Sequence, residues 1–307
     1  MPNPEPIRLK FWGVRGSIPS PGPETIKYGG NTPCIELQFA GKPLFILDAG
    51  SGIRQLGKYL LKSNDPVKAY IFISHYHWDH IQGLPFFKPA FKPGNHIIIY
   101  GCDEPNVKLN EIISTQMNPT YFPLAIEDML ARIEFRTIRE EKFEVEGIQV
   151  QTKYLNHPGY TLGYRFNYNG KSIVYMSDNE PVYYPKAPRN NGPPSQKQIA
   201  ELFDEYGEDN MEDIIKFIKN ADILIHDTQY FPDEYVERKT WGHSPFDYTI
   251  NIAKKANVKR LILFHHDPDH DDPTIDLKVK YSRKLLRQKE HKIICEAARE
   301  GHVIKLI

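Results

Sequence analysis

Cysteine is scarce in this chain, which excludes a fold held together by disulfides. The 307 residues include only Cys34, Cys102 and Cys295, an odd number of cysteines that lie far apart in the sequence. No two of them have the spacing of a cysteine zinc site or the pairing of a disulfide framework. We therefore expect three reduced, packed thiols.

Long apolar runs and an excess of one charge are also absent. No run reaches the roughly 18 apolar residues of a membrane-spanning helix, and the polar, proline-rich first residues lack the apolar segment of a secretory signal. Lysine and arginine total 39, as do aspartate and glutamate, so no overall charge favours a membrane surface or an extended nucleic acid. These absences predict a soluble, cytoplasmic protein that does not bind membranes.

Short strand patterns recur along the chain, with helical patterns between and after them and no internal repeat. The expected strands are 7–12, 34–39, 44–47, 69–73, 96–100, 132–138, 148–154, 162–168, 172–176, 223–225, 261–264 and 303–306. The expected helices are 53–61, 107–116, 198–206, 211–219, 246–256 and 277–288. This order predicts an α/β fold, a four-layer αββα sandwich in which two mixed β-sheets carry helices on their outer faces.

We expect one domain over residues 1–307, interrupted by an insertion at about 181–215. Its first half, 183–196, is rich in proline, asparagine and glycine. Because the insertion directly follows a candidate ligand segment, we expect it to cover part of the active site; a plain surface insertion is the alternative.

Four potential metal ligands stand within six residues, directly after an apolar run. They are His75, His77, Asp79 and His80. Imidazole and carboxylate groups suit zinc and related metals, and two histidines leaving a strand can turn toward one ion while Asp79 and His80 reach a second. A histidine-rich loop without metal is the alternative, but it leaves the concentration of ligands after a buried strand unexplained.

Ligand-type side chains also follow three later apolar runs. They are His157, Asp178 and His265, with His266 and His270 as rivals of His265. A hydrolase with two metal ions collects about seven or eight donors from several strand ends. The sequence supplies that number.

These motifs resemble the metallo-β-lactamase superfamily, whose H-x-H-x-D-H signature matches residues 75–80 without a gap. The resemblance extends over nearly the whole chain, including the segments 11–17 and 28–32 and the Asp-x-Gly turn at 48–50. It implies the four-layer fold expected above. For Asp48 it leaves two roles open, support of the metal ligands or a purely structural turn.

The resemblance implies two divalent metal ions, with Zn²⁺ preferred and Mn²⁺ or Fe²⁺ as alternatives. Many relatives are homodimers, so the partner that the resemblance implies is a second copy of the chain. It assigns one ion to His75, His77 and His157, the other to Asp79, His80 and His265, and the bridging position to Asp178. His265 is preferred to His266 because it is the first residue after the strand, and His266 is expected in the pocket or beside the ligands.

The segments 225–229 and 241–245 resemble the phosphodiesterase branch of this superfamily, which contains ribonuclease Z and cyclic-nucleotide phosphodiesterase-like hydrolases. This implies that His243 is the general acid of the reaction and that Asp227 orients it; with Asp79 they form the expected catalytic set. The alternative for His243 is to cap the following helix. Ser244 and Pro245, however, already form a suitable N-cap and first-turn pair.

We therefore expect a binuclear metal-dependent hydrolase that cleaves a small phosphodiester, such as a cyclic nucleotide, with a metal-bridging hydroxide. Within 183–210 the chain carries three basic and five acidic residues, which does not suit a clamp for RNA. The basic run at 278–292 is expected to be a solvated helix face.

Other classes remain as alternatives. They are a transfer-RNA 3′-processing endonuclease, a carbon-ester or thioester hydrolase, an iron oxidoreductase of the same fold and a non-catalytic binding module. The oxidoreductase branch has glutamate where this chain has His77, and degenerate binding modules lack ligands that are present here.

Overall fold

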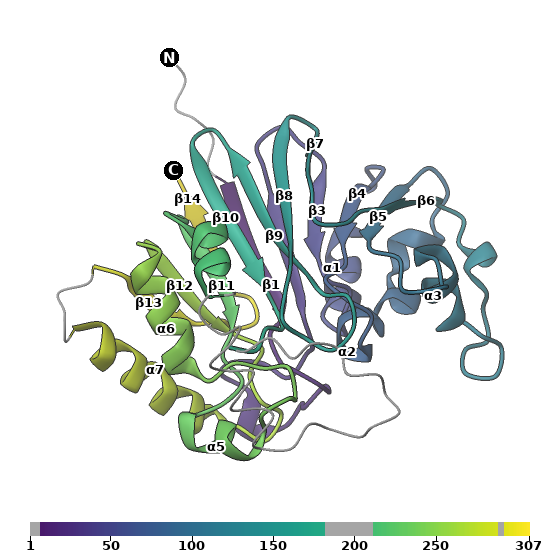
Figure 1. The fold of residues 1–307 in the computed structure, drawn as a ribbon. Helices are drawn as coiled ribbons and strands as arrows, with labels where there is room; N and C mark the ends of the chain where they lie inside the picture. Colours follow the sequence, from purple (N-terminus) through teal and green to yellow (C-terminus); the bar gives the residue numbers. More distant parts are fainter. Residues whose placement is uncertain (1–6, 182–210, 288–291) are drawn as a thin grey trace.

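The computed structural model describes residues 7–181, 211–287 and 292–307 (Figure 1). The greater part of the insertion expected at 181–215, and the whole helix expected at 198–206, lie outside the described residues. Cys34, Cys102 and Cys295 are buried and unpaired, as expected. No helix among the described residues is long and apolar enough to cross a membrane.

Two seven-stranded mixed sheets form the centre of the fold. The first has the order β14-β1-β2-β3-β4-β5-β6, and its strands β3 to β6 are parallel. Its strands are β1 (Ile7–Gly13), β2 (Cys34–Gln38), β3 (Leu44–Leu47), β4 (Lys68–Phe72), β5 (His96–Gly101), β6 (Arg132–Thr137) and β14 (Val303–Leu306).

The second sheet has the order β13-β12-β11-β10-β9-β8-β7, and its strands β10 to β13 are parallel. Its strands are β7 (Lys142–Val145), β8 (Ile148–Tyr154), β9 (Leu162–Tyr168), β10 (Lys171–Met176), β11 (Ile223–Asp227), β12 (Arg260–Phe264) and β13 (Ile294–Ala297). The last strand of the chain, β14, returns to pair antiparallel with β1 in the first sheet.

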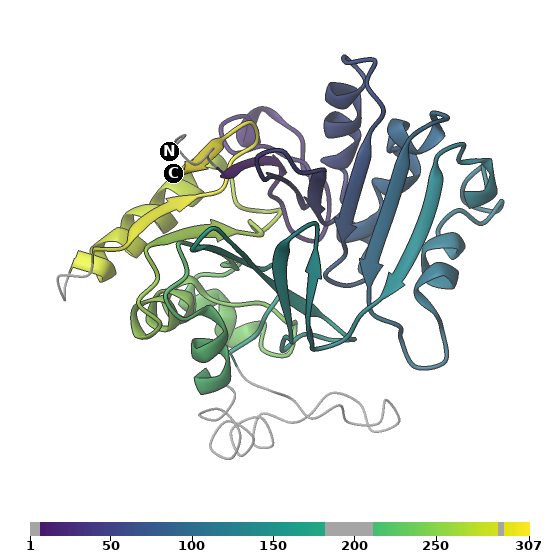
Figure 2. The same cartoon turned by 90° about the horizontal axis from the view of Figure 1, so that it is seen from above.

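Helices cover the outer faces of both sheets (Figures 1 and 2). The α-helices are α1 (Ile53–Leu60), α2 (Trp78–Ile81), α3 (Leu109–Thr115), a helix over 211–218, α5 (Pro232–Glu237), α6 (Phe246–Lys255) and α7 (Asp272–Arg287). The 3-10 helices are η1 (Pro23–Thr25), η2 (Leu84–Phe86), η3 (Lys88–Phe91) and η4 (Ile126–Asp128). Helices α1 and α3 pack on the first sheet, whereas α6 and α7 pack on the second.

The main apolar core lies between the two sheets. Side chains that alternate along β1 enter it, and aromatic rings from both sheets meet there, as where Phe72 packs edge-on against Phe166 with ring centroids 5.2 Å apart. Two further apolar clusters join each sheet to its helices. The predicted four-layer αββα sandwich is confirmed.

Several local predictions need correction. Strands β7 and β13 were not expected, because they are short and contain polar residues. Helix α5 was not expected either. Helix α7 begins at Asp272, ahead of the expected residue 277, because Asp271 accepts the Thr274 N–H at 2.8 Å and caps it. Ser244 does not cap α6, because the N-cap of this helix is Pro245. The Ser244 hydroxyl donates instead to the carbonyl oxygen of Asn179.

The basic run at 278–292 is not a uniformly solvated face. Four of its members in α7 are exposed, namely Lys280, Arg283, Lys284 and Arg287. Lys278, however, is fully buried. The expectation is wrong for this residue because its position on α7 faces the second sheet, where its ammonium group finds polar partners.

Candidate metal centre

The carboxyl ends of the parallel strands in both sheets meet at one edge of the sandwich. His75 and Asp178 follow β4 and β10 within three residues, and His265 is the first residue after β12. Side chains that leave adjacent strand ends at such an edge converge, which is why parallel sheets bind ligands there. The fold therefore brings together residues that are far apart in the sequence.

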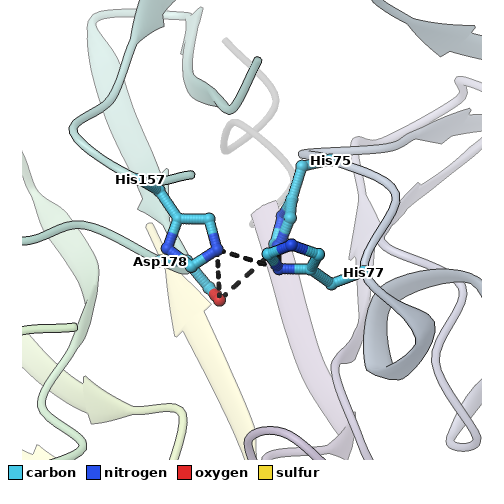
Figure 3. A group of neighbouring side chains, drawn as sticks. All are labelled: His75, His77, His157 and Asp178. Atoms are coloured by element: carbon cyan, nitrogen blue, oxygen red, sulfur yellow. Dashed lines mark hydrogen bonds and ion pairs between the residues drawn. The ribbon is translucent and has the colours of Figure 1, made fainter. Parts of the chain in front are cut away.

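Three histidines and one aspartate form the first donor group (Figure 3). The Nδ1 atom of His77 lies 3.0 Å from Nε2 of His75 and 2.9 Å from Nε2 of His157. One oxygen of Asp178, Oδ2, lies 3.6 Å from both of these Nε2 atoms. Figure 3 shows the three rings and the carboxylate turned toward one another.

A second donor group lies beside the first. Oδ2 of Asp79 is 3.1 Å from Nε2 of His80 and 3.1 Å from Nε2 of His265. The other oxygen of Asp178, Oδ1, lies 3.3 Å from the same two nitrogens. Asp178 therefore turns one oxygen to each group.

The two groups fit a pair of divalent cations. Buried polar atoms normally have hydrogen-bond partners. Within the described part of the chain, however, Nε2 of His80 and Oδ1 of Asp178 are buried and make no hydrogen bond of acceptable geometry, although they lie close together. Imidazole nitrogens and carboxylate oxygens at such distances are the donor set that zinc, manganese or iron accepts.

The pKa values of the first group also suit a cation. Burial lowers the pKa of His75 and His77, and it lowers that of His157 to about 3, so all three rings stay neutral with lone pairs available. Burial raises the pKa of Asp178, but neighbouring histidines, His265 first, outweigh it and hold the pKa well below its ordinary value.

In the second group negative charge dominates. Burial lowers the pKa of His80, but the carboxylates of Asp79, Asp178 and Asp48 outweigh burial and raise it well above its ordinary value. A proton on His80 thus supplies the positive charge that this cluster of carboxylates requires. A divalent ion would supply the same charge and release that proton.

Hydrogen bonds behind the histidines fix which ring nitrogen faces the centre. Nδ1 of His157 donates to the carbonyl oxygen of Gly242 at 2.8 Å, and Nδ1 of His265 donates to Oε1 of Gln229 at 2.9 Å. Nδ1 of His80 donates to Oδ2 of Asp48 at 2.7 Å. Partners of this kind orient metal-binding histidines and raise their basicity.

Asp48 does more than shape its turn. It has a positive φ of 57°, and besides His80 it accepts hydrogen bonds from the Ser74 N–H and from the Tyr175 hydroxyl at 2.7 and 2.6 Å. Of the two roles that the sequence left open, the contacts favour support of the potential ligands.

His243 and Asp227 lie beside the two donor groups. Nδ1 of His243 donates to Oδ2 of Asp227 at 2.9 Å and lies 3.8 Å from Asp178, while Oδ1 of Asp227 accepts the Gln229 N–H at 2.9 Å. Burial lowers the pKa of His243, but Asp227, aided by Asp178 and Asp79, outweighs it and raises the pKa to about 9. Its ring is therefore protonated at neutral pH.

A cavity of about 250 Å³ opens onto these groups. Its walls consist of Ser17, His77, Trp78, Asp79, Asp178, His243 and His265. Members of both donor groups and the protonated ring of His243 thus line one small cavity.

Sequence reasoning assigned no role to several residues that shape this centre. Ser17, which has a positive φ of 63°, donates its N–H to Oδ2 of Asp79 at 2.8 Å. Buried Glu180 accepts the Thr240 and Gly242 N–H groups at 2.7 and 2.9 Å, and burial raises its pKa to about 7. The segment 11–17 already belonged to the resemblance and could have drawn attention to Ser17, whereas Glu180 carries no such signal.

Neither rival of His265 reaches the centre. Nε2 of His266 donates to the carbonyl oxygen of Ala298 at 2.9 Å, so the expectation that His266 lies in the pocket or beside the ligands is wrong. Nε2 of His270 contacts Oε1 of Glu234 at 2.9 Å. The backbone turns at His265, whose φ is positive, and the next side chain leaves in another direction.

Residues 44–191 match the family model described as beta-lactamase superfamily domain. Among similar curated proteins, the ribonuclease Z of Picrophilus torridus is 27% identical over 290 residues, covering 87% of this chain and 87% of that protein. The ribonuclease Z of Pyrococcus horikoshii is 24% identical over 288 residues, covering 85% and 87%.

Solved structures show the same fold. The metallo-β-lactamase fold protein YhfI from Bacillus subtilis has a TM-score of 0.67 at 18% identity and covers 98% of this chain and 100% of its own. The short form of human tRNase Z has a TM-score of 0.59 at 20% identity and covers 97% and 98%. Residues 44–191 thus match the beta-lactamase superfamily domain, the described residues have the metallo-β-lactamase fold, and the chain is a metal-dependent hydrolase.

Proposed function

We propose that the protein hydrolyses phosphodiester bonds at a centre of two divalent metal ions. The observation that carries this proposal is Asp178, whose two oxygens face two separate donor groups. In this proposal His75, His77 and His157 would hold one ion, Asp79, His80 and His265 would hold the other, and Asp178 would offer one oxygen to each. Zn²⁺ suits these nitrogen and oxygen donors first, and Mn²⁺ or Fe²⁺ would also be accepted.

When bound, the ions would supply a nucleophile from water near neutral pH and would neutralise negative charge on phosphate oxygens. The remaining chemistry belongs to the chain itself. The leaving oxygen of a phosphodiester must receive a proton unless it is a stable anion. A protonated side chain on the cavity wall can supply that proton.

His243 is the proposed general acid. Its Nδ1–H is bound to Asp227, so its Nε2–H remains to donate, and the Asp227 carboxylate raises the pKa of the ring, which favours its protonated form. Asp227 orients the ring and stabilises its positive charge. Asp227 in turn is held by the Gln229 N–H, so the acid has a fixed direction.

For the substrate we propose a compact phosphodiester such as a cyclic nucleotide. The cavity of about 250 Å³ is small, and the chain has no net charge to attract a polyanion. A cytoplasmic location and a homodimer stay predictions.

A transfer-RNA precursor is the second candidate, because curated relatives covering most of this chain are named ribonuclease Z. RNA binding rests on many contacts to phosphates and weakens steeply with salt. Activity on precursor transfer RNA that falls steeply with added salt, without activity on cyclic nucleotides, would establish this candidate and reject the compact substrate.

The test combines metal analysis with His243→Ala. The purified protein should contain two divalent ions per chain, and the variant should keep them. General acids contribute about 10²- to 10⁴-fold, so kcat on a cyclic nucleotide should fall by about 100-fold or more. Turnover of bis(p-nitrophenyl) phosphate should fall less, because nitrophenolate leaves without a proton.

The control is His302→Ala, since His302 stacks on Phe11 and belongs neither to the donor groups nor to the cavity wall, so both activities should stay unchanged. An equal loss with both substrates would reject His243 as the acid. Hydrolysis of a lactone or thioester but of no phosphodiester would reject the proposed reaction.

A further inference from the structure

Lys278 is a charged residue buried in α7, on the side facing the second sheet. None of its surface is exposed. Its Nζ donates to the carbonyl oxygens of Thr228 and Gln229 at 2.7 and 2.8 Å, and it lies 3.2 Å from Nδ1 of His270. An ammonium group has three N–H donors, so these three acceptors use its full capacity.

The two carbonyl oxygens belong to the turn that follows β11. The turn begins directly after Asp227, which holds His243, and contains Gln229, whose side chain holds His265. The Thr228 N–H donates to the carbonyl oxygen of Phe264 at 3.0 Å, at the end of β12 and immediately before His265. The turn thus connects the proposed acid to one proposed metal ligand.

The charge of Lys278 is costly where it lies. Transfer of an ammonium group from water into a protein interior costs several kcal/mol unless its partners compensate. Burial lowers the pKa of Lys278 to about 8, although the carboxylates of Glu234, Asp267 and Asp227 act in the opposite direction. An apolar side chain would fill the same volume without this cost. It would leave the carbonyl oxygens of Thr228 and Gln229 without their ammonium donor.

We propose that Lys278 is a positioning residue, which holds the Thr228–Gln229 turn so that His243 and His265 keep their directions. It touches neither the substrate nor a metal ion. Its effect passes through Asp227 to the acid and through the Gln229 side chain to His265. The inference rests on the proposed function, because that proposal is what assigns His243 and His265 their roles.

The test is Lys278→Met, with Lys280→Met as the matched control on an exposed position of the same helix. Changes behind metal-binding histidines typically cost 10- to 100-fold. We expect Lys278→Met to lower kcat for a phosphodiester by about tenfold with little change in KM, because the acid acts in the transition state. We also expect one bound Zn²⁺ to dissociate about tenfold more readily in a chelator competition.

A purely structural link between α7 and the sheet would lower the unfolding temperature without these changes. Lys278→Met with kcat and Zn²⁺ affinity equal to those of Lys280→Met would therefore overturn the inference. If Lys278→Met does not fold, Gln229→Met removes the last link to His265 together with a 3.4 Å contact to Asp267. Unchanged Zn²⁺ affinity in that variant would also overturn the inference.

The metal measurement separates this inference from the proposed function. A parent protein that binds two Zn²⁺ ions but hydrolyses no phosphodiester would reject the proposed function, while the competition experiment would still decide the role of Lys278. A parent that binds no divalent ion would overturn both.

Discussion

Replacement of Gly242 by alanine should disturb one half of the metal centre through a single methyl group. Gly242 has a φ of 88°, and a Cβ added there would lie 2.2 Å from Nδ1 of His157 and 2.6 Å from Cδ of Pro158. The left-handed conformation costs about 1–2 kcal/mol for a residue with a Cβ, and overpacking adds about 1–3 kcal/mol. We therefore expect Gly242→Ala to lose about 2–5 kcal/mol of unfolding free energy.

The same methyl group should displace His157, because the ring and the Gly242 carbonyl oxygen that accepts its hydrogen bond cannot both keep their places. Loss of such a partner typically weakens metal binding by about 10- to 100-fold. Urea unfolding and elemental analysis after dialysis measure the two effects. The variant should retain about one ion per chain where the parent retains two, since only the group containing His157 is disturbed.

Gly170→Ala is the matched control. Gly170 also has a positive φ, 72°, but a Cβ there would meet nothing within 4 Å. This variant should therefore show the backbone strain alone, about 1–2 kcal/mol, with unchanged metal content. If Gly242→Ala loses no more stability than Gly170→Ala and keeps its metal, the proposed placement of His157 in the centre is wrong.

Two further predictions concern Asp48 and Lys278. Asp48→Asn removes the negative charge behind His80, so Zn²⁺ affinity in a chelator competition should fall by about 10- to 100-fold. An affinity within twofold of the parent would show that the hydrogen bond between Asp48 and His80 does not support metal binding. The pKa of Lys278 is about 8 when folded against an ordinary 10.5, so the folded state binds fewer protons between these values. Unfolding free energy should therefore rise with pH through this window by up to about 3 kcal/mol, and Lys278→Met should abolish that part of the slope in urea unfolding measured at several pH values.

The seven proposed ligands could be found from the sequence because each has a signal in its own neighbourhood. His75 to His80 form a dense motif, and His157, Asp178 and His265 each follow a strand pattern within three residues. The ends of adjacent parallel strands meet at one edge of a sheet, so a residue at each end predicts convergence. The four-layer fold follows from the same strand and helix patterns, and only short polar elements such as β7 were missed.

The residues that hold these ligands in place could not be found in this way. Gly242 acts through its carbonyl oxygen, Glu180 accepts backbone N–H groups, and Lys278 donates to two backbone carbonyl oxygens. Every residue offers such backbone groups, so the sequence contains no sign of which ones will lie beside a given side chain. The position of Lys278 in a basic run even suggested a solvated face. Only the packing of α7 against the turn after β11 reveals that this charge lies inside the protein, where its removal should disturb the centre.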